Sequence, residues 1–348
     1  MAEVGVGGGP NTFVPTFSPA TGQLQIEFTR SVNQFPITRY AQIVPVTAMK
    51  GYYLKIDEEE TARMVNTQDA QWPLGEDRPT GINSDFEFIA YQTQRFQNSF
   101  SIPQETARQS AWDIVASHAR IQAAKMMTHR AYRAASTLTT TANYTLNSNY
   151  FPKSITLAGS AGYIGAAADS DPVQKIVRAA MEQIIKNTVG VVTPKDIIMV
   201  MNPTTARKIA SDPGVREYVK NTPHALSALQ GDATFSTYGL PQTLFGLGGV
   251  VVDDTVSVTT RKGGANTRGF FYGGDTPGVV FVSRPNGLIG NEGPSFSSLT
   301  VFAYEDMTVE TLEDPWNRRI KGSVVDNSAI ELTAPLASLY IADISAAS

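Results

Sequence analysis

Three aspartates follow short apolar runs in the second half of the chain, a placement that could serve phosphoryl transfer. Asp253 and Asp254 end the run Val250–Val252, and Asp275 follows Phe270–Tyr272. Carboxylates at strand ends are where an α/β phosphotransferase holds Mg²⁺. Carboxylates after a strand are more often turn residues, and no phosphate-binding loop lies beside these. A Mg²⁺-dependent phosphoryl-transfer enzyme therefore stands as an alternative from a different functional class.

Other residue types that support catalysis are sparse or wrongly spaced. His118 and His129 are separated by about 16 Å of helix, so they cannot share a metal, and we interpret them as core or interface histidines. The glycines at 246, 248 and 249 precede a strand instead of opening a helix, which argues against a dinucleotide site. The chain has no cysteine, which excludes thiolate chemistry. We therefore expect a protein that is not an enzyme and needs no cofactor or metal.

Length and charge narrow the class further. A chain of 348 residues can hold one large or two medium domains, and its net charge of −4 argues against a protein that coats nucleic acid with a basic surface. Enclosing nucleic acid remains compatible with that charge. No apolar run approaches the roughly 20 residues of a membrane span, and the first 29 residues contain no Lys or Arg. We expect neither a membrane partner nor a secretory signal.

A long helix is predicted from Pro103 to Ala135. Ser101 and Gln104 are typical of a capping box, with Pro103 in the first turn. About 33 residues would span roughly 50 Å, more than a domain of this size needs, so we interpret the helix as a spine along which other parts lie. Its apolar residues recur at helical spacing at Ala111, Ile114, Val115, Ala119, Ile121 and Met126.

Residues 51–100 predict a long two-stranded hairpin with an irregular tip at 66–85. A hairpin of this length has no core of its own. It holds nine acidic and four basic residues, whereas the predicted helix holds five basic and two acidic residues. Opposite charge favours a contact between hairpin and helix, and its main use would be register and partner choice.

The remaining segments are assigned by composition. Residues 1–40 are apolar and broken by proline, so we interpret them as an arm that docks on other surfaces, with an ordinary N-terminal strand pair as the alternative. Residues 171–297 alternate helix and strand, as in an α/β or α+β domain. From residue 298 the chain reads as extended, and we expect its strands to pack beside the spine helix.

This order of parts resembles the Hong Kong 97-type major capsid proteins of tailed bacteriophages. The segment His224–Val282, with its run Val252-Asp253-Asp254, is similar to part of their axial domain, and Asp196–Pro203 (DIIMVMNP) resembles the strand before the next helix of that domain. The resemblance covers nearly the whole chain. It implies an α+β, Hong Kong 97-like capsid fold. The implied parts are an N-terminal arm and first peripheral strand at 1–50, an extended E-loop at 51–100, a peripheral domain with the spine helix at 101–170, an axial domain at 171–297, and returning peripheral strands with the C-terminus at 298–348.

The resemblance also implies a function. The expected protein is a structural major capsid protein of the virion, assembled in the host cytoplasm through noncovalent contacts into pentamers and hexamers of an icosahedral shell around double-stranded DNA. Expected partners are other copies of the chain, packaged DNA bound without sequence specificity, and portal, scaffolding or decoration proteins. The tip at 66–85 has no lysine, so the covalent crosslinking of some family members is not expected. Within the same fold, an encapsulin-like compartment holding a cargo enzyme is the alternative.

In this family arrangement each E-loop lies over a neighbouring subunit. The residues expected at that contact are Asp57, Glu58, Glu59, Trp72, Glu76 and Asp77 on the loop, and Arg120, Lys125, Arg130 and Arg133 on the helix.

Overall fold

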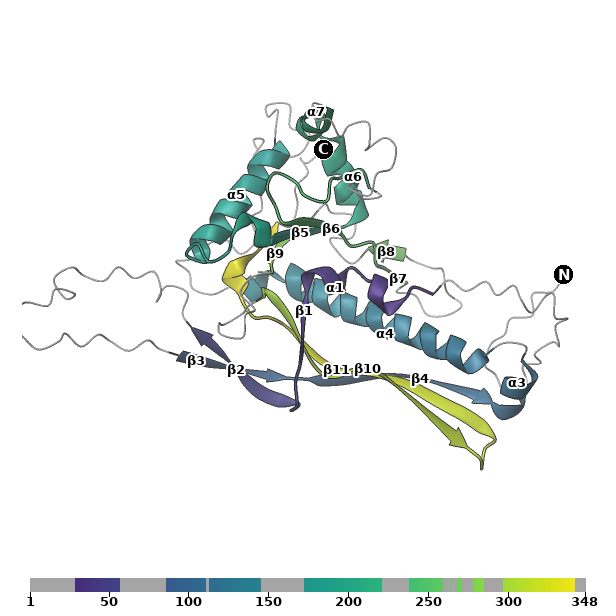
Figure 1. Ribbon diagram of the computed structural model, residues 1–348. Coiled ribbons are helices and arrows are strands. Elements are labelled where there is room, and N and C mark those ends of the chain that lie inside the picture. The colour runs from purple at the N-terminus through teal and green to yellow at the C-terminus, as the bar shows by residue number, and fades with distance from the viewer. Residues whose placement is uncertain are drawn as a thin grey trace, which may run out of the picture.

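The computed structural model describes residues 29–56, 86–110, 113–144, 172–220, 238–258, 264, 268–270, 278–284 and 297–341. In these parts of the chain, helices combine with two four-stranded sheets and two short two-stranded ribbons (Figure 1). The smaller ribbon pairs β7 (Val256–Val258) with β8 (Arg268–Phe270). The mixed helix and strand content agrees with the predicted α+β class.

The first sheet, called the long sheet here, has the order β1-β10-β11-β4. β1 is parallel to β10, and the other pairs are antiparallel. Its long members β10 and β11 lie next to each other, as expected for strands that return late in the chain. The strands are β1 (Gln42–Pro45), β10 (Leu299–Asp314), β11 (Arg319–Leu332) and β4 (Gln94–Pro103).

One face of the long sheet is covered by α4 (Ile114–Thr139) (Figure 1). The prediction of a single helix from Pro103 is wrong, because a separate short helix, α3 (Gln104–Gln109), precedes α4. Ser101 does not cap a helix, since β4 extends past it and pairs it with Lys321. Asp113 caps α4 instead, accepting a hydrogen bond from the Ala116 N–H at 2.9 Å. The 26 residues of α4 span about 40 Å, still long enough to act as a spine.

The second sheet, called the short sheet here, has the order β12-β9-β5-β6 and is buried on both faces. Ile197 and Met199 of β5 pack with the helices above the sheet, whereas Val200 packs toward α4. This alternation explains why the strand reads as a continuous apolar run. The strands are β12 (Ser338–Ile341), β9 (Val279–Ser283), β5 (Ile197–Met201) and β6 (Gly249–Val252), and the helices are α5 (Pro172–Asn187), α6 (Pro203–Ser211) and α7 (Pro213–Lys220). No described helix is both long and apolar enough to cross a membrane.

Two expectations about the chain ends are corrected. β12 does not lie beside β10 and β11 but pairs with β9, because Leu339 and Ile341 join the apolar core under α5. Residues 29–41 do not reach out as an arm: η1 (Val32–Gln34) and α1 (Ile37–Tyr40) lie against α4 of the same chain, and Phe35 is buried there. The rest of the predicted arm, residues 1–28, lies outside the described residues.

The pairing at the base of the predicted hairpin is confirmed. β2 (Lys50–Ile56) and β3 (Phe86–Gln92) pair antiparallel from Lys50–Gln92 to Ile56–Phe86. The extended run after residue 86 is not one strand, however. It breaks at Thr93, whose N–H donates to the Met49 carbonyl, and then continues as β4 in the long sheet. One continuous segment therefore links the β2–β3 hairpin to the sheet under α4.

Candidate inter-subunit surfaces

The ten predicted contact residues divide into two groups. The acidic group and Trp72 fall in 57–85, outside the described residues. The four basic residues all lie on α4, but the structure places them in three different environments.

Arg130 is a core residue and not a surface contact, which corrects the prediction for this position. Its side chain is 2 % exposed and faces Asp326 of β11, which is fully buried. Nη2 and Nε donate to the two carboxylate oxygens at 2.6 and 3.2 Å, and Nη1 lies 2.7 Å from Asp306. Burial alone would lower the pKa of Arg130, but the hydrogen bonds and charges of Asp326 and Asp306 hold it above its ordinary value. The arginine therefore fastens α4 to the long sheet.

Arg133 also turns toward its own sheet. Its guanidinium donates to the Ser328 carbonyl at 2.9 Å and lies 4.3 Å above the ring of Phe96. Burial lowers its pKa, the charge of Asp326 opposes that shift, and the nearby Arg130 adds to it. These contacts leave the side chain of Arg133 half-buried. Its guanidinium is therefore less accessible to a neighbouring subunit than the sequence suggests.

Arg120 and Lys125 are exposed on α4, as the predicted contact requires. Arg120 donates to the hydroxyl of Ser117 one turn earlier at 3.1 Å, which holds its side chain along the helix. The role of both residues at an inter-subunit contact stays a prediction.

The base of the β2–β3 hairpin is anchored on an aromatic stack that the sequence did not reveal. Tyr91 lies 4.5 Å from Phe302 of β10 with the rings nearly parallel, and Tyr53 lies 5.6 Å from the same ring. Burial, together with Glu331 and Glu87, raises the pKa of Tyr53 to about 12, so the stack stays uncharged. Gly51 sits directly beneath Tyr91, where any larger residue would displace the ring. Stacking of this kind fixes the direction in which the hairpin leaves the sheet.

The opposite face of the β2–β3 hairpin is apolar and exposed. Tyr52 is 73 % exposed, Phe88 67 % and Leu54 51 %, and Leu54 pairs directly with Phe88. Large apolar side chains grouped on one face mark interaction sites more often than ordinary surface. This face is the strongest candidate for a contact between subunits.

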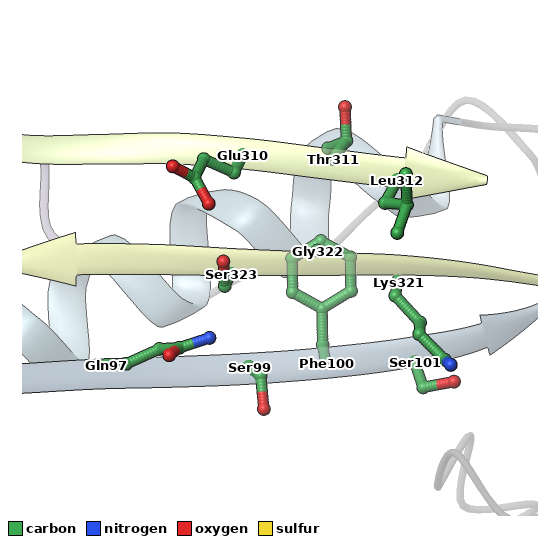
Figure 2. A pocket seen from close by; sticks show the side chains of 10 residues that line it. All are labelled: Gln97, Ser99, Phe100, Ser101, Glu310, Thr311, Leu312, Lys321, Gly322 and Ser323. Atoms are coloured by element: carbon green, nitrogen blue, oxygen red, sulfur yellow. The ribbon is translucent and has the colours of Figure 1, made fainter. Parts of the chain in front are cut away.

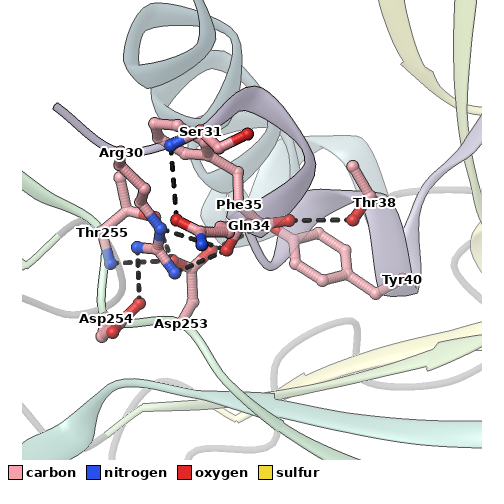
Figure 3. A network of polar contacts seen from close by, with 9 residues as sticks. All are labelled: Arg30, Ser31, Gln34, Phe35, Thr38, Tyr40, Asp253, Asp254 and Thr255. Carbon is pink, nitrogen blue, oxygen red and sulfur yellow. Dashed lines mark hydrogen bonds and ion pairs between the residues drawn. The ribbon is translucent and has the colours of Figure 1, made fainter. Parts of the chain in front are cut away.

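Asp253 and Asp254, the possible magnesium ligands, bind the N-terminal segment instead (Figure 3). Asp253 is buried and accepts hydrogen bonds from the Tyr40 hydroxyl at 3.0 Å and from the N–H and hydroxyl of Thr255 at 3.0 and 2.5 Å. Asp254 forms an ion pair with Arg30 at 2.8 Å. The two carboxylates therefore tie residues 29–41 to the end of β6.

The described residues contain no group of three or more His, Asp or Glu side chains that could hold a metal ion. Asp275, the third predicted ligand, lies outside those residues. The ring of His118 stacks on Phe100, and the ring of His129 lies tilted against Phe96 with 4.7 Å between the centroids, which agrees with their interpretation as packed histidines. Burial lowers the pKa of both imidazoles, and the nearby Lys125 and Arg133 add to that shift.

The buried Asp253 predicts a specific pH dependence. Burial raises its pKa above the ordinary 3.8, although hydrogen bonds from Thr255 and Tyr40 oppose the shift. Because the unfolded chain then loses its proton first, the free energy of unfolding should fall relative to Asp253→Asn as the pH rises above about 4. Urea unfolding at a series of pH values measures this difference. Equal slopes for the wild type and Asp253→Asn would contradict the prediction.

Comparison with known proteins identifies the family. A family model described as phage capsid protein matches residues 87–324, more than half of the chain. A comparison with curated protein sequences gave no match.

Several solved structures share the fold. A phage-related protein from Bordetella bronchiseptica is 18 % identical with a TM-score of 0.60, and the match covers 91 % of this chain and 94 % of that one. The capsid of Cyanophage P-SCSP1u is 12 % identical with a TM-score of 0.57 over 96 % and 94 % of the chains. The mature capsid of bacteriophage PhiM1 is 12 % identical with a TM-score of 0.54 over the same shares. With the long sheet, the spine helix and the short sheet arranged as in a Hong Kong 97-like α+β fold, the chain belongs to the phage capsid protein family, as a structural major capsid protein of the virion.

Proposed function

We propose that this capsid protein assembles through noncovalent contacts into pentamers and hexamers of an icosahedral shell that encloses double-stranded DNA. Its role in that shell is structural, without catalysis, cofactor or metal. The observation that carries the proposal is the exposed apolar face of the β2–β3 hairpin, with Tyr52, Leu54 and Phe88 directed away from their own sheet. An isolated subunit gains nothing from such a face, whereas an assembled one buries it.

The contact that we propose places each E-loop over the α4 helix of a neighbouring subunit. The acidic residues Asp57, Glu58, Glu59, Glu76 and Asp77 would then approach Arg120 and Lys125, with Trp72 beside them. Exposed ion pairs contribute at most about 1 kcal/mol each, so these charges would set register while apolar burial supplies affinity. Arg130 and Arg133 support the contact indirectly, by holding α4 on the long sheet.

The division into an E-loop, a peripheral domain, an axial domain and the returning strands β10 and β11 is part of the same proposal. So are portal, scaffolding and decoration proteins as partners, packaged DNA held without sequence-specific binding, and the lack of a membrane partner. The net charge of −4 supports a shell that encloses DNA without binding it tightly through a basic surface.

Replacing residues 57–85 with a Gly/Ser segment of equal length should leave a folded, soluble subunit that no longer forms closed shells. The β2–β3 pairing and the Phe302 stack lie outside the replaced segment, so the subunit keeps its core. Negative-stain electron microscopy compares the particles, and circular dichroism confirms the fold. A double variant, Arg120→Glu and Lys125→Glu, should weaken assembly in the same direction. Closed shells from the Gly/Ser variant would show that the loop does not drive assembly.

The content of the shell separates the proposal from the encapsulin-like alternative. Particles isolated from the natural host should contain nuclease-protected DNA of genome length. Particles that contain a cargo enzyme and no such DNA would favour the compartment instead.

A further inference from the structure

The turn that joins β10 to β11 presents a tryptophan to solvent. Trp316 is 93 % exposed, the largest fraction among the exposed apolar side chains of the described residues. Tryptophan is seldom exposed to this extent in a soluble protein, and it is the residue type most enriched where protein contacts concentrate their binding energy. The turn lies at the end of the long sheet, beyond the part covered by α4 (Figure 1).

This turn is held in one conformation. The carboxylate of Asp314 accepts hydrogen bonds from the backbone and side-chain nitrogens of Asn317 at 3.2 and 2.8 Å, and from Lys321 at 2.7 Å. Arg318 closes the turn in the left-handed region at φ 49°, and its carbonyl accepts from Gln104 at 2.8 Å. These hydrogen bonds keep the pKa of Asp314 well below its usual range. A tryptophan on so ordered a turn loses little conformational entropy when it binds.

A groove lies on the same hairpin, on the face of the long sheet opposite α4 (Figure 2). Phe100 and Gly322 mark the α4 side, because Phe100 stacks on His118. Alternate residues of the same strands point the other way. The side chains on that outer face are Gln97, Ser99, Ser101, Glu310, Leu312, Lys321 and Ser323. Leu312 is 67 % exposed, so its side chain offers an apolar surface to an aromatic ring.

The charges of this hairpin match a second copy of itself. On the outer face, β10 carries Glu310, whereas the start of β11 carries Arg319 and Lys321. A partner with the same hairpin can set its basic end against this acidic strand and its acidic strand against this basic end. The groove and both charges thus lie on one face of the hairpin, with the tryptophan at its tip.

We propose that Trp316 of one subunit inserts into the groove between β4, β11 and β10 of another subunit. The inference rests on the proposed assembly into a shell and adds a second contact, independent of the E-loop. The indole would pack on Leu312 and on the aliphatic stem of Lys321, with the hydroxyls of Ser99 and Ser323 at the edges where the ring N–H can find an acceptor.

The lack of cysteine in the chain allows a clean crosslinking test. Particles are assembled from a mixture of two single variants, Trp316→Cys and Ser99→Cys, and treated with a short bismaleimide. Covalent dimers of the mixed type are expected. Mixing Trp316→Cys with Ser211→Cys, which is exposed on α6, is the control and should give none. Dimers that form equally with both partners, or only with the control, would overturn the proposal.

A second measurement covers the energetic role. Trp316→Ala should raise the protein concentration needed for assembly by about tenfold or more while leaving the melting temperature of the subunit unchanged. Val191→Ala, at an exposed position after α5 and away from both proposed contacts, is the control. If the unmodified chain forms no particles, the proposed shell itself fails. If it does form them and Trp316→Ala assembles at the same concentration, only the Trp316 contact is overturned.

Discussion

Replacing Asp326 with Ala is expected to lower the free energy of unfolding of the subunit by about 3–5 kcal/mol. The variant leaves the guanidinium of Arg130 buried at 2 % exposure without the carboxylate that accepts two of its hydrogen bonds. Asp306 stays 2.7 Å from Nη1, but it is half exposed and contacts only one nitrogen. Urea unfolding followed by circular dichroism measures the loss.

Two controls separate an unpaired charge from lost packing. The double variant Arg130→Met with Asp326→Leu removes both charges and keeps much of the volume, so it should recover most of the lost stability. Asp306→Ala should cost much less than Asp326→Ala, because solvent can take over from an exposed partner. A loss below about 1 kcal/mol for Asp326→Ala would mean that the pair does not hold α4 to the sheet.

The position of Arg130 shows what the sequence could and could not predict about the candidate site. The count of basic residues on the helix is correct, but it does not say which side of the helix meets the sheet. The buried face includes Met126, Met127 and Ala134, and Arg130 falls one helical turn from each of them. That spacing was the signal in the sequence that Arg130 lies on the buried face of the helix. The partner, Asp326, is 196 residues away, and no local pattern reveals it.

The fold, too, has parts that the sequence predicts and parts that it does not. Elements with a strong period of their own, such as α5, β5 and the β2–β3 pair, are predicted well. The errors occur where a distant contact decides. Residues 29–41 look like a docking arm because the partner of Tyr40, Asp253, is 213 residues away. Leu339 and Ile341 form a strand on any reading, but only the core under α5 selects the short sheet for them.

The glycines at 246, 248 and 249 are the site of the second substitution with a large expected loss of stability. Gly248→Ala is expected to destabilise the subunit by about 3 kcal/mol or more, because the new methyl group would overlap the backbone carbonyl of Lys195. The backbone cannot easily yield there, since the N–H of Gly248 donates to the carbonyls of Pro194 and Ile197, both at 3.0 Å. Those bonds align β6 with β5 at the pair Ile198–Gly249. A glycine run that resembles a nucleotide-binding motif thus serves close backbone packing.

Gly246 supplies the control for this substitution. It lies in the left-handed region at φ 93°, but a methyl group there would meet nothing within 4 Å. Gly246→Ala should therefore cost only the conformational term of roughly 1 kcal/mol, and the short sheet should stay intact. Urea unfolding of both variants gives the comparison. Equal losses at the two positions would show that backbone conformation, and not the approach to Lys195, is what selects glycine at 248.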